Sequence, residues 1–119
     1  MYALPFYASF LSLGSALFAV RVGQHPLVPL AVFLTSINYW RRPTPGIRRT
    51  LDMIVVCLGG VYQLSYPSAA YRISVLVCLV CYFVARRRRS ARWHCALHIV
   101  ANAGNCLLYA QITGYGSYK

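Results

Sequence analysis

The residues of this chain that could carry chemistry are polar side chains set inside long apolar runs. His94, His98, Asn102 and Asn105 follow one another at spacings of four, four and three residues. On a helix, at about 100° per residue, they fall within roughly 80° of arc and form one polar stripe. Polar groups are costly in lipid, so each is a functional candidate if the run crosses a membrane.

Two further apolar runs carry polar groups. Asp52 and Gln63 share one face of a helix that begins near residue 50, and Ser36 stands near the end of the run before it. Ser36, Asn38, Asp52, His94 and His98 lie near helix ends that we expect at a similar depth in the membrane. If the three helices are neighbours, these polar groups converge, so the sequence predicts a pocket where these helix ends meet.

Five apolar segments must position these side chains, and together they predict an all-α, polytopic transmembrane bundle. The expected helices cover residues 2–21, 26–40, 50–66, 69–86 and 92–112, so residues 1–112 form one domain and residues 113–119 a flexible tail. The hydrocarbon core of a bilayer is about 30 Å thick and needs about 20 helical residues. The second segment is shorter, so four spans with one re-entrant segment is the alternative to five spans.

The arginines lie in the connections between these segments. Connections with many arginines alternate along the chain with connections that hold one. The second connection holds four of them and the fourth holds five, whereas the first and third hold one each. Because cation-rich connections stay in the cytoplasm, we expect a multi-pass integral membrane protein whose N-terminus is cytoplasmic. The cations of the rich connections are Arg41, Arg42, Arg48, Arg49, Arg86, Arg87, Arg88, Arg89 and Arg92.

Composition favours a membrane protein over a nucleic-acid-binding protein. Hydrophobic residues make up 59% of the chain, the net charge is +11, and Asp52 is the one acidic residue. The cations gather at the ends of apolar runs instead of covering a basic face. We expect anionic lipid headgroups to contact Arg86, Arg87, Arg88 and Arg89, with other membrane subunits as further partners and no nucleic acid.

Ordinary structural roles are open for each polar residue. Asp52 stands four residues after Arg48, the spacing of an ion pair on one helix face. Ser36 can donate its hydroxyl to a carbonyl one turn back. Asn102 and Asn105 can form hydrogen bonds between helices.

Small and aromatic residues indicate how the helices pack. Ala8, Ser12 and Ala16 recur every fourth residue in the first helix, which lets another helix approach closely. Aromatic residues near the helix ends are typical of the belt at membrane interfaces, so we assign them no role in a site. They include Tyr39, Trp40, Tyr66, Tyr71, Trp93 and Tyr109.

The order Ser36, Asp52 and then His94-x-x-x-His98 resembles the pattern of the CREST membrane hydrolases, a superfamily that includes alkaline ceramidases and the progestin and adiponectin receptors. The resemblance implies a zinc ion bound by His94 and His98, with Asp52 and Ser36 as the catalytic side chains. Without it we expect no cofactor. The chain departs from the family because aromatic residues stand where a third His is expected, and two of the family's helices are missing.

Three functional hypotheses follow. The first is a small, non-catalytic integral membrane protein that acts as an accessory subunit or lipid-associated scaffold. The second is a shortened CREST-like, zinc-dependent hydrolase of a lipid amide or ester, so the sequence does not decide whether the chain is an enzyme. The third is a transporter or channel lined by Gln63, Asn102 and Asn105.

Overall fold

The chain folds into helices joined by short connections. The computed structural model describes the backbone of residues 3–117 and the side chains of residues 3–112, and this part contains no strand. The all-α prediction is therefore confirmed. The helices are α1 (Ala3–Ala8), α2 (Phe10–Arg21), α3 (Leu27–Trp40), α4 (Ile47–Leu64), α5 (Ala69–Arg88) and α6 (Ala91–Ser117).

The first predicted helix is interrupted once. The Ser9 hydroxyl donates to the carbonyl oxygen of Pro5 at 2.8 Å, between α1 and α2. A serine that bonds to the carbonyl one turn back is a known cause of helix bending. The two pieces still form one apolar segment, Ala3–Arg21.

Local signals set the other helix ends. The α4 helix begins three residues before the predicted start, directly after Gly46, whose φ of 145° belongs to the region that favours glycine. Ser68 is the N-cap of α5, because its hydroxyl accepts a hydrogen bond from the Tyr71 amide at 3.2 Å.

The turn between α5 and α6 is closed by a left-handed residue. Arg89 has a φ of 49°, and the next amide, that of Ser90, donates to the Ala85 carbonyl at 3.0 Å. These are the features of a left-handed helix C-terminus, a position usually taken by glycine. The α6 helix then continues to Ser117, five residues beyond the predicted end at residue 112. The predicted tail is thus helical over residues 113–117, and residues 118–119 lie outside the described residues.

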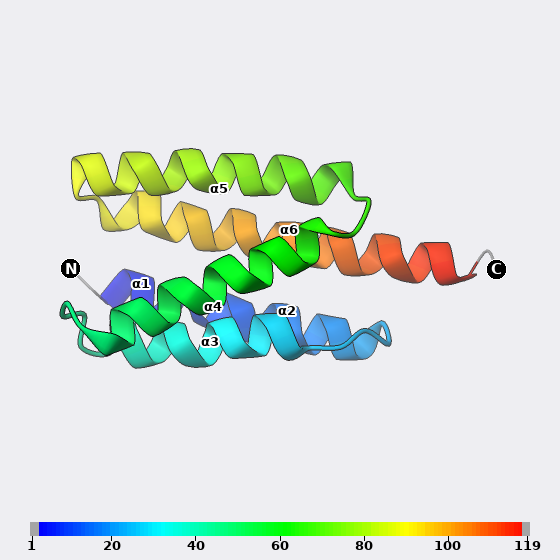
Figure 1. The fold of residues 1–119 in the computed structure, drawn as a ribbon, viewed down its shortest axis with the longest axis horizontal. Coiled ribbons are helices and arrows are strands. Elements are labelled where there is room, and N and C mark those ends of the chain that lie inside the picture. Colours follow the sequence, from blue (N-terminus) through cyan, green and yellow to red (C-terminus); the bar gives the residue numbers. More distant parts are fainter. Residues whose placement is uncertain (1–2, 118–119) are drawn as a thin grey trace.

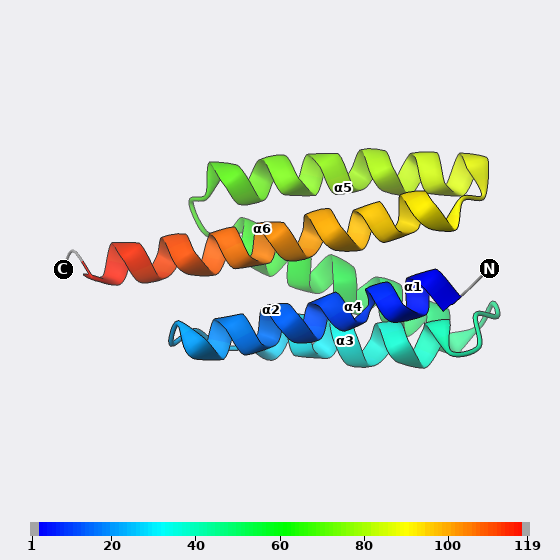
Figure 2. The ribbon, with the colours of Figure 1, turned by 180° about the vertical axis from the view of Figure 1, so that it is seen from behind.

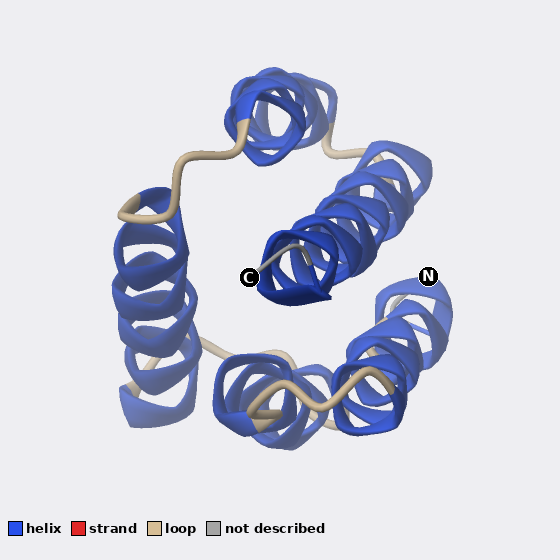
Figure 3. Cartoon of the chain, turned by 90° about the vertical axis from the view of Figure 1, so that its right-hand side faces the viewer, coloured by secondary structure: helices blue, strands red, loops and turns tan. Residues whose placement is uncertain are grey.

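The α1 and α2 helices run in the same direction, and each later helix runs antiparallel to the one before it (Figures 1 and 2), in a bundle 47 Å long. We call one end the arginine-rich end: it holds the start of α1, residues 41–46 and the α5–α6 turn, and with them nine arginines. The opposite end holds residues 22–26 and 65–68. Seen end-on, α6 lies between α5 and the α1–α2 segment (Figure 3), and it packs against both.

The interior of this bundle mixes polar and apolar side chains, and large apolar side chains cover much of its surface. Serines, Gln63, His98 and Asn102 are buried beside alanines, Leu108 and aromatic rings. Large aliphatic and aromatic side chains are exposed, among them Leu17 at 65% and Phe83 at 66%. Water-soluble domains bury such side chains and rarely expose contiguous apolar patches larger than a few hundred Å². The buried serines are Ser9, Ser12, Ser15, Ser36 and Ser68.

Within the described residues, two segments are long and apolar enough to cross a membrane, namely Ala3–Arg21 and Ala69–Arg88. The α3 helix is apolar but has only 14 residues. The α4 helix carries Arg48, Arg49 and Asp52 in its first turns, and the polar stripe lowers the hydropathy of α6. By length and composition alone, two of the five predicted spans are thus able to cross a bilayer.

Candidate functional site

The acidic residue of the chain lies between α3 and α4 near the arginine-rich end. Asp52 Oδ1 accepts hydrogen bonds from the Ser36 hydroxyl at 2.8 Å and from the Thr35 hydroxyl at 3.1 Å. Ser36 is 1% exposed, so this contact is sealed from solvent on the α3 side. The structure thus brings Ser36 and Asp52 together, and Ser36 does not use its hydroxyl to bond back along its own helix.

Arg48, one turn before Asp52 on α4, forms its hydrogen bonds with the end of α3 and the α3–α4 connection and not with the carboxylate. The Arg48 guanidinium donates to the carbonyl oxygen of Asn38 at 3.2 Å and to that of Arg42 at 2.8 Å. Arg48 also reaches the Thr44 hydroxyl at 3.3 Å. Within the part of the chain that the structure describes, Asp52 therefore has hydroxyl partners and no arginine partner.

The two histidines of the stripe stack on successive turns of α6, also near the arginine-rich end. The ring centroids of His94 and His98 are 5.2 Å apart, and the His94 ring meets that of Trp40 at 4.6 Å. His98 is 6% exposed, and its Nε2 atom is buried without a hydrogen-bond partner. This arrangement leaves one imidazole nitrogen unsatisfied in the interior.

These histidines do not assemble with Asp52 into a metal site. A catalytic zinc site normally uses three protein ligands. Among the described residues, no group of three or more His, Cys, Asp or Glu side chains is close enough to hold a metal ion. The pair His94 and His98 supplies two such side chains. The zinc ion, and the CREST resemblance that implies it, stay predictions.

The rest of the polar stripe joins α6 to its neighbours. Asn102 accepts a hydrogen bond from the Ser15 hydroxyl of α2 at 2.6 Å and donates to the His98 carbonyl at 2.8 Å. Asn105 is half-buried. At the far end of α6, Gln111 accepts from the Ser68 hydroxyl at 2.7 Å. Asn102 therefore has the interhelical role that the sequence left open.

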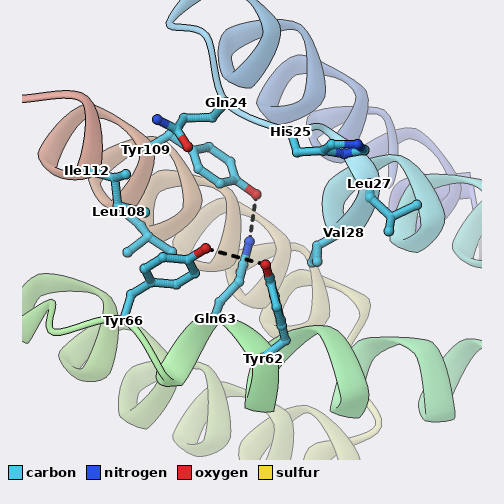
Figure 4. Close-up of a pocket in the computed structure, with 10 residues that line it drawn as sticks. All are labelled: Gln24, His25, Leu27, Val28, Tyr62, Gln63, Tyr66, Leu108, Tyr109 and Ile112. Carbon is cyan, nitrogen blue, oxygen red and sulfur yellow. Dashed lines mark hydrogen bonds between the residues drawn. The ribbon is translucent and has the colours of Figure 1, made fainter. Parts of the chain in front are cut away.

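A cavity of about 300 Å³ lies at the opposite end of the bundle, away from the helix ends where the sequence predicted a pocket (Figure 4). Of the residues predicted to line a channel, Gln63 borders it, whereas Asn102 and Asn105 do not. Its polar and aromatic lining consists of Gln24, His25, Tyr62, Gln63, Tyr66 and Tyr109. Its aliphatic lining consists of Leu27, Val28, Leu108 and Ile112.

The sequence reasoning missed Tyr109 by placing it in an interfacial belt. Tyr109 is 5% exposed, and its hydroxyl accepts a hydrogen bond from Gln63 Nε2 at 2.6 Å (Figure 4). The sequence did indicate that Tyr109 faces the interior, because Tyr109 follows Asn105 by four residues and so continues the polar stripe of α6. The loop residues Gln24 and His25 carried no such signal.

The cluster Arg86, Arg87, Arg88 and Arg89 belongs to a helix end instead of a loop. The first three form the last turn of α5, and Arg89 caps it. All four are exposed. Cations at a helix C-terminus complement the negative end of the helix dipole.

Comparison of the chain with protein-family models, with curated proteins and with solved structures finds no match.

Proposed function

We propose that this protein is a small, multi-pass integral membrane protein with a non-catalytic role as an accessory or scaffold component, whose arginine-rich end contacts anionic lipid headgroups. The observation that carries the proposal is the apolar surface of the bundle. Leucines, valines and phenylalanines such as Leu17, Val61 and Phe83 face outward, whereas serines, Gln63, His98 and Asn102 are among the buried residues. Hydrocarbon is the solvent in which such a surface is stable.

The internal hydrogen bonds support this reading. Ser15 with Asn102, Ser36 with Asp52, and Gln63 with Tyr109 each link two helices. In lipid, polar side chains and small residues hold helices together, since apolar surfaces gain little from contact with one another. The pairs therefore account for the polar residues as structural links, without assigning them a reaction.

The arginines support the lipid contact. Nine of them lie at one end of the bundle, and Asp52 does not pair with them within the described residues. An arginine close to an anionic membrane surface gains about 1 kcal/mol. Anionic headgroups are thus the natural partners of the exposed cluster at the end of α5.

Two measurements test the proposal. Sodium carbonate extraction of membranes from cells that express the chain should leave it in the pellet. Addition of phosphatidylglycerol to neutral maltoside micelles should then raise the melting temperature of the purified protein.

A matched pair of double variants tests which arginines are responsible. The increase in melting temperature should shrink in the Arg86→Gln/Arg87→Gln variant and persist in Arg21→Gln/Arg72→Gln, which removes the same charge at the opposite end. Release of the chain by carbonate, or equal loss of the lipid effect in both variants, would refute the proposal.

A further inference from the structure

The cavity at the opposite end has walls of a consistent chemical kind. Figure 4 shows the rings of Tyr62, Tyr66 and Tyr109 and the imidazole of His25 around it. The ten residues that line it include no Asp, Glu, Lys or Arg. Its volume of about 300 Å³ is that of a site for a small ligand or a headgroup.

Hydrogen bonds hold these rings in place. The hydroxyls of Tyr62 and Tyr66 are 3.3 Å apart, and the two rings stand at 82° with centroids 5.9 Å apart. Gln63, which follows Tyr62 in the last turn of α4, donates to the Tyr109 hydroxyl of α6, and Tyr66 lies just beyond the end of α4. The hydroxyls thus already have partners within the protein, and the aromatic rings that carry them border the cavity.

The absence of charge from this lining decides which ligands suit it. The lining holds no Lys or Arg that could form an ion pair with an anion. A small, strongly hydrated cation needs carboxylates or a ring of carbonyl oxygens to replace its water. A quaternary ammonium group is weakly hydrated and binds to the electron-rich faces of aromatic rings.

We propose that this cavity binds a quaternary ammonium group of the choline type. The positive net charge of the protein does not oppose this, because nine of the twelve cations lie at the arginine-rich end of a bundle 47 Å long. Charges are screened over about 8 Å at physiological salt. This proposal goes beyond the proposed function, which concerns the arginine-rich end, because it places a ligand-binding site at the opposite end of the bundle.

Two sources can supply this chemistry: a free choline-type solute and the headgroup of phosphatidylcholine. The first experiment uses the purified full chain in maltoside micelles, which contain no quaternary ammonium. Choline is titrated by calorimetry beside 3,3-dimethylbutan-1-ol, which has the same shape and no charge. Choline should bind at least tenfold more tightly than the alcohol, because the ring faces act on the charge.

Variants connect the binding to the rings. Tyr66→Leu removes a ring and should weaken choline binding about tenfold. Tyr109→Phe keeps the ring and should change binding less than about threefold, so it shows that ring faces and not hydroxyls are responsible. Tyr7→Leu changes an exposed tyrosine of α1, at the arginine-rich end, and should have no effect. Circular dichroism checks that each variant is folded.

The source is identified in lipid nanodiscs. Choline binding that is lost in phosphatidylcholine discs and kept in phosphatidylethanolamine discs identifies the lipid headgroup as the occupant. Binding that is equal in both identifies the free solute. Equal affinity for choline and the neutral alcohol, unchanged affinity in a folded Tyr66→Leu variant, or no choline binding to the folded wild type would overturn the proposal.

Discussion

The close contact of α5 with α6 leads to a prediction about one glycine. A methyl group added at Gly104 would lie 2.7 Å from Ser74 Cβ and 2.8 Å from Ser74 Oγ. Carbon atoms in good contact are about 3.5–4.0 Å apart, so the two helices would have to separate by about 1 Å. Gly60 of α4 has no neighbour within 4 Å of the corresponding position and provides the control.

The magnitudes follow from two opposing effects. Alanine favours a helix over glycine by about 1 kcal/mol, which applies to both positions. Overpacking costs about 1–3 kcal/mol and applies to Gly104→Ala alone. Gly60→Ala should therefore stabilise the protein by about 1 kcal/mol. The Gly104→Ala variant should be about 1–3 kcal/mol less stable than Gly60→Ala.

A reversible unfolding titration in mixed micelles, followed by circular dichroism, measures both variants. The rescue is specific: Ser74→Gly removes the two atoms that clash, so the double variant Ser74→Gly/Gly104→Ala should recover most of the overpacking cost. If Gly104→Ala stabilises as much as Gly60→Ala, or if Ser74→Gly brings no recovery, the packing of α5 on α6 described here is wrong.

Three further predictions concern hydrogen bonds and one strained residue. A double-mutant cycle of Ser15→Ala and Asn102→Ala, measured by the same titration, should give a coupling of about 0.6–1.7 kcal/mol, and a coupling of zero would mean that the two side chains do not meet. Asp52→Asn keeps an oxygen acceptor for the two hydroxyls of α3 and should be more stable than Asp52→Leu by about 1 kcal/mol; equal stabilities would argue against these bonds. Arg89→Gly relieves a left-handed backbone and should raise stability by about 1 kcal/mol, whereas Arg88→Gly, in the helix, should lower it by a similar amount. A loss in both would contradict the assigned turn.

Much of the helical framework could be predicted from the sequence. Apolar runs broken by prolines and arginines marked the helices to within a few residues, apart from the end of α6. The stripe on α6 was correctly predicted to share a face, and His98 and Asn102 are buried on it. Periodicity succeeds here because it depends on the geometry of one helix alone.

Contacts between side chains of different helices were harder to predict from the sequence. Ser36 and Asp52 do meet, since they belong to consecutive helices joined by a short loop. His94 and His98 occupy a similar depth, yet they do not join Asp52 in a metal-binding group among the described residues. Depth follows from position along the chain. The direction that each side chain faces within the bundle depends on helix packing, which one sequence does not specify.

The cavity shows a second limit. A tyrosine near a helix end looks the same in the sequence whether it sits at a membrane interface or lines a site. What distinguishes Tyr109 is its bond to Gln63, 46 residues earlier in the chain. That contact exists only once α4 and α6 are brought together at the end of the bundle away from the arginines.

If the bundle crosses the bilayer as proposed, its two ends lie in different compartments. In a variant whose five cysteines are replaced by alanine, Thr44→Cys and Ser65→Cys place one exposed thiol at the arginine-rich end and the opposite end, respectively. A membrane-impermeant maleimide should label the cysteine at position 65 in intact cells and the one at position 44 only in inverted vesicles. Labelling of both positions from the same side would contradict the account.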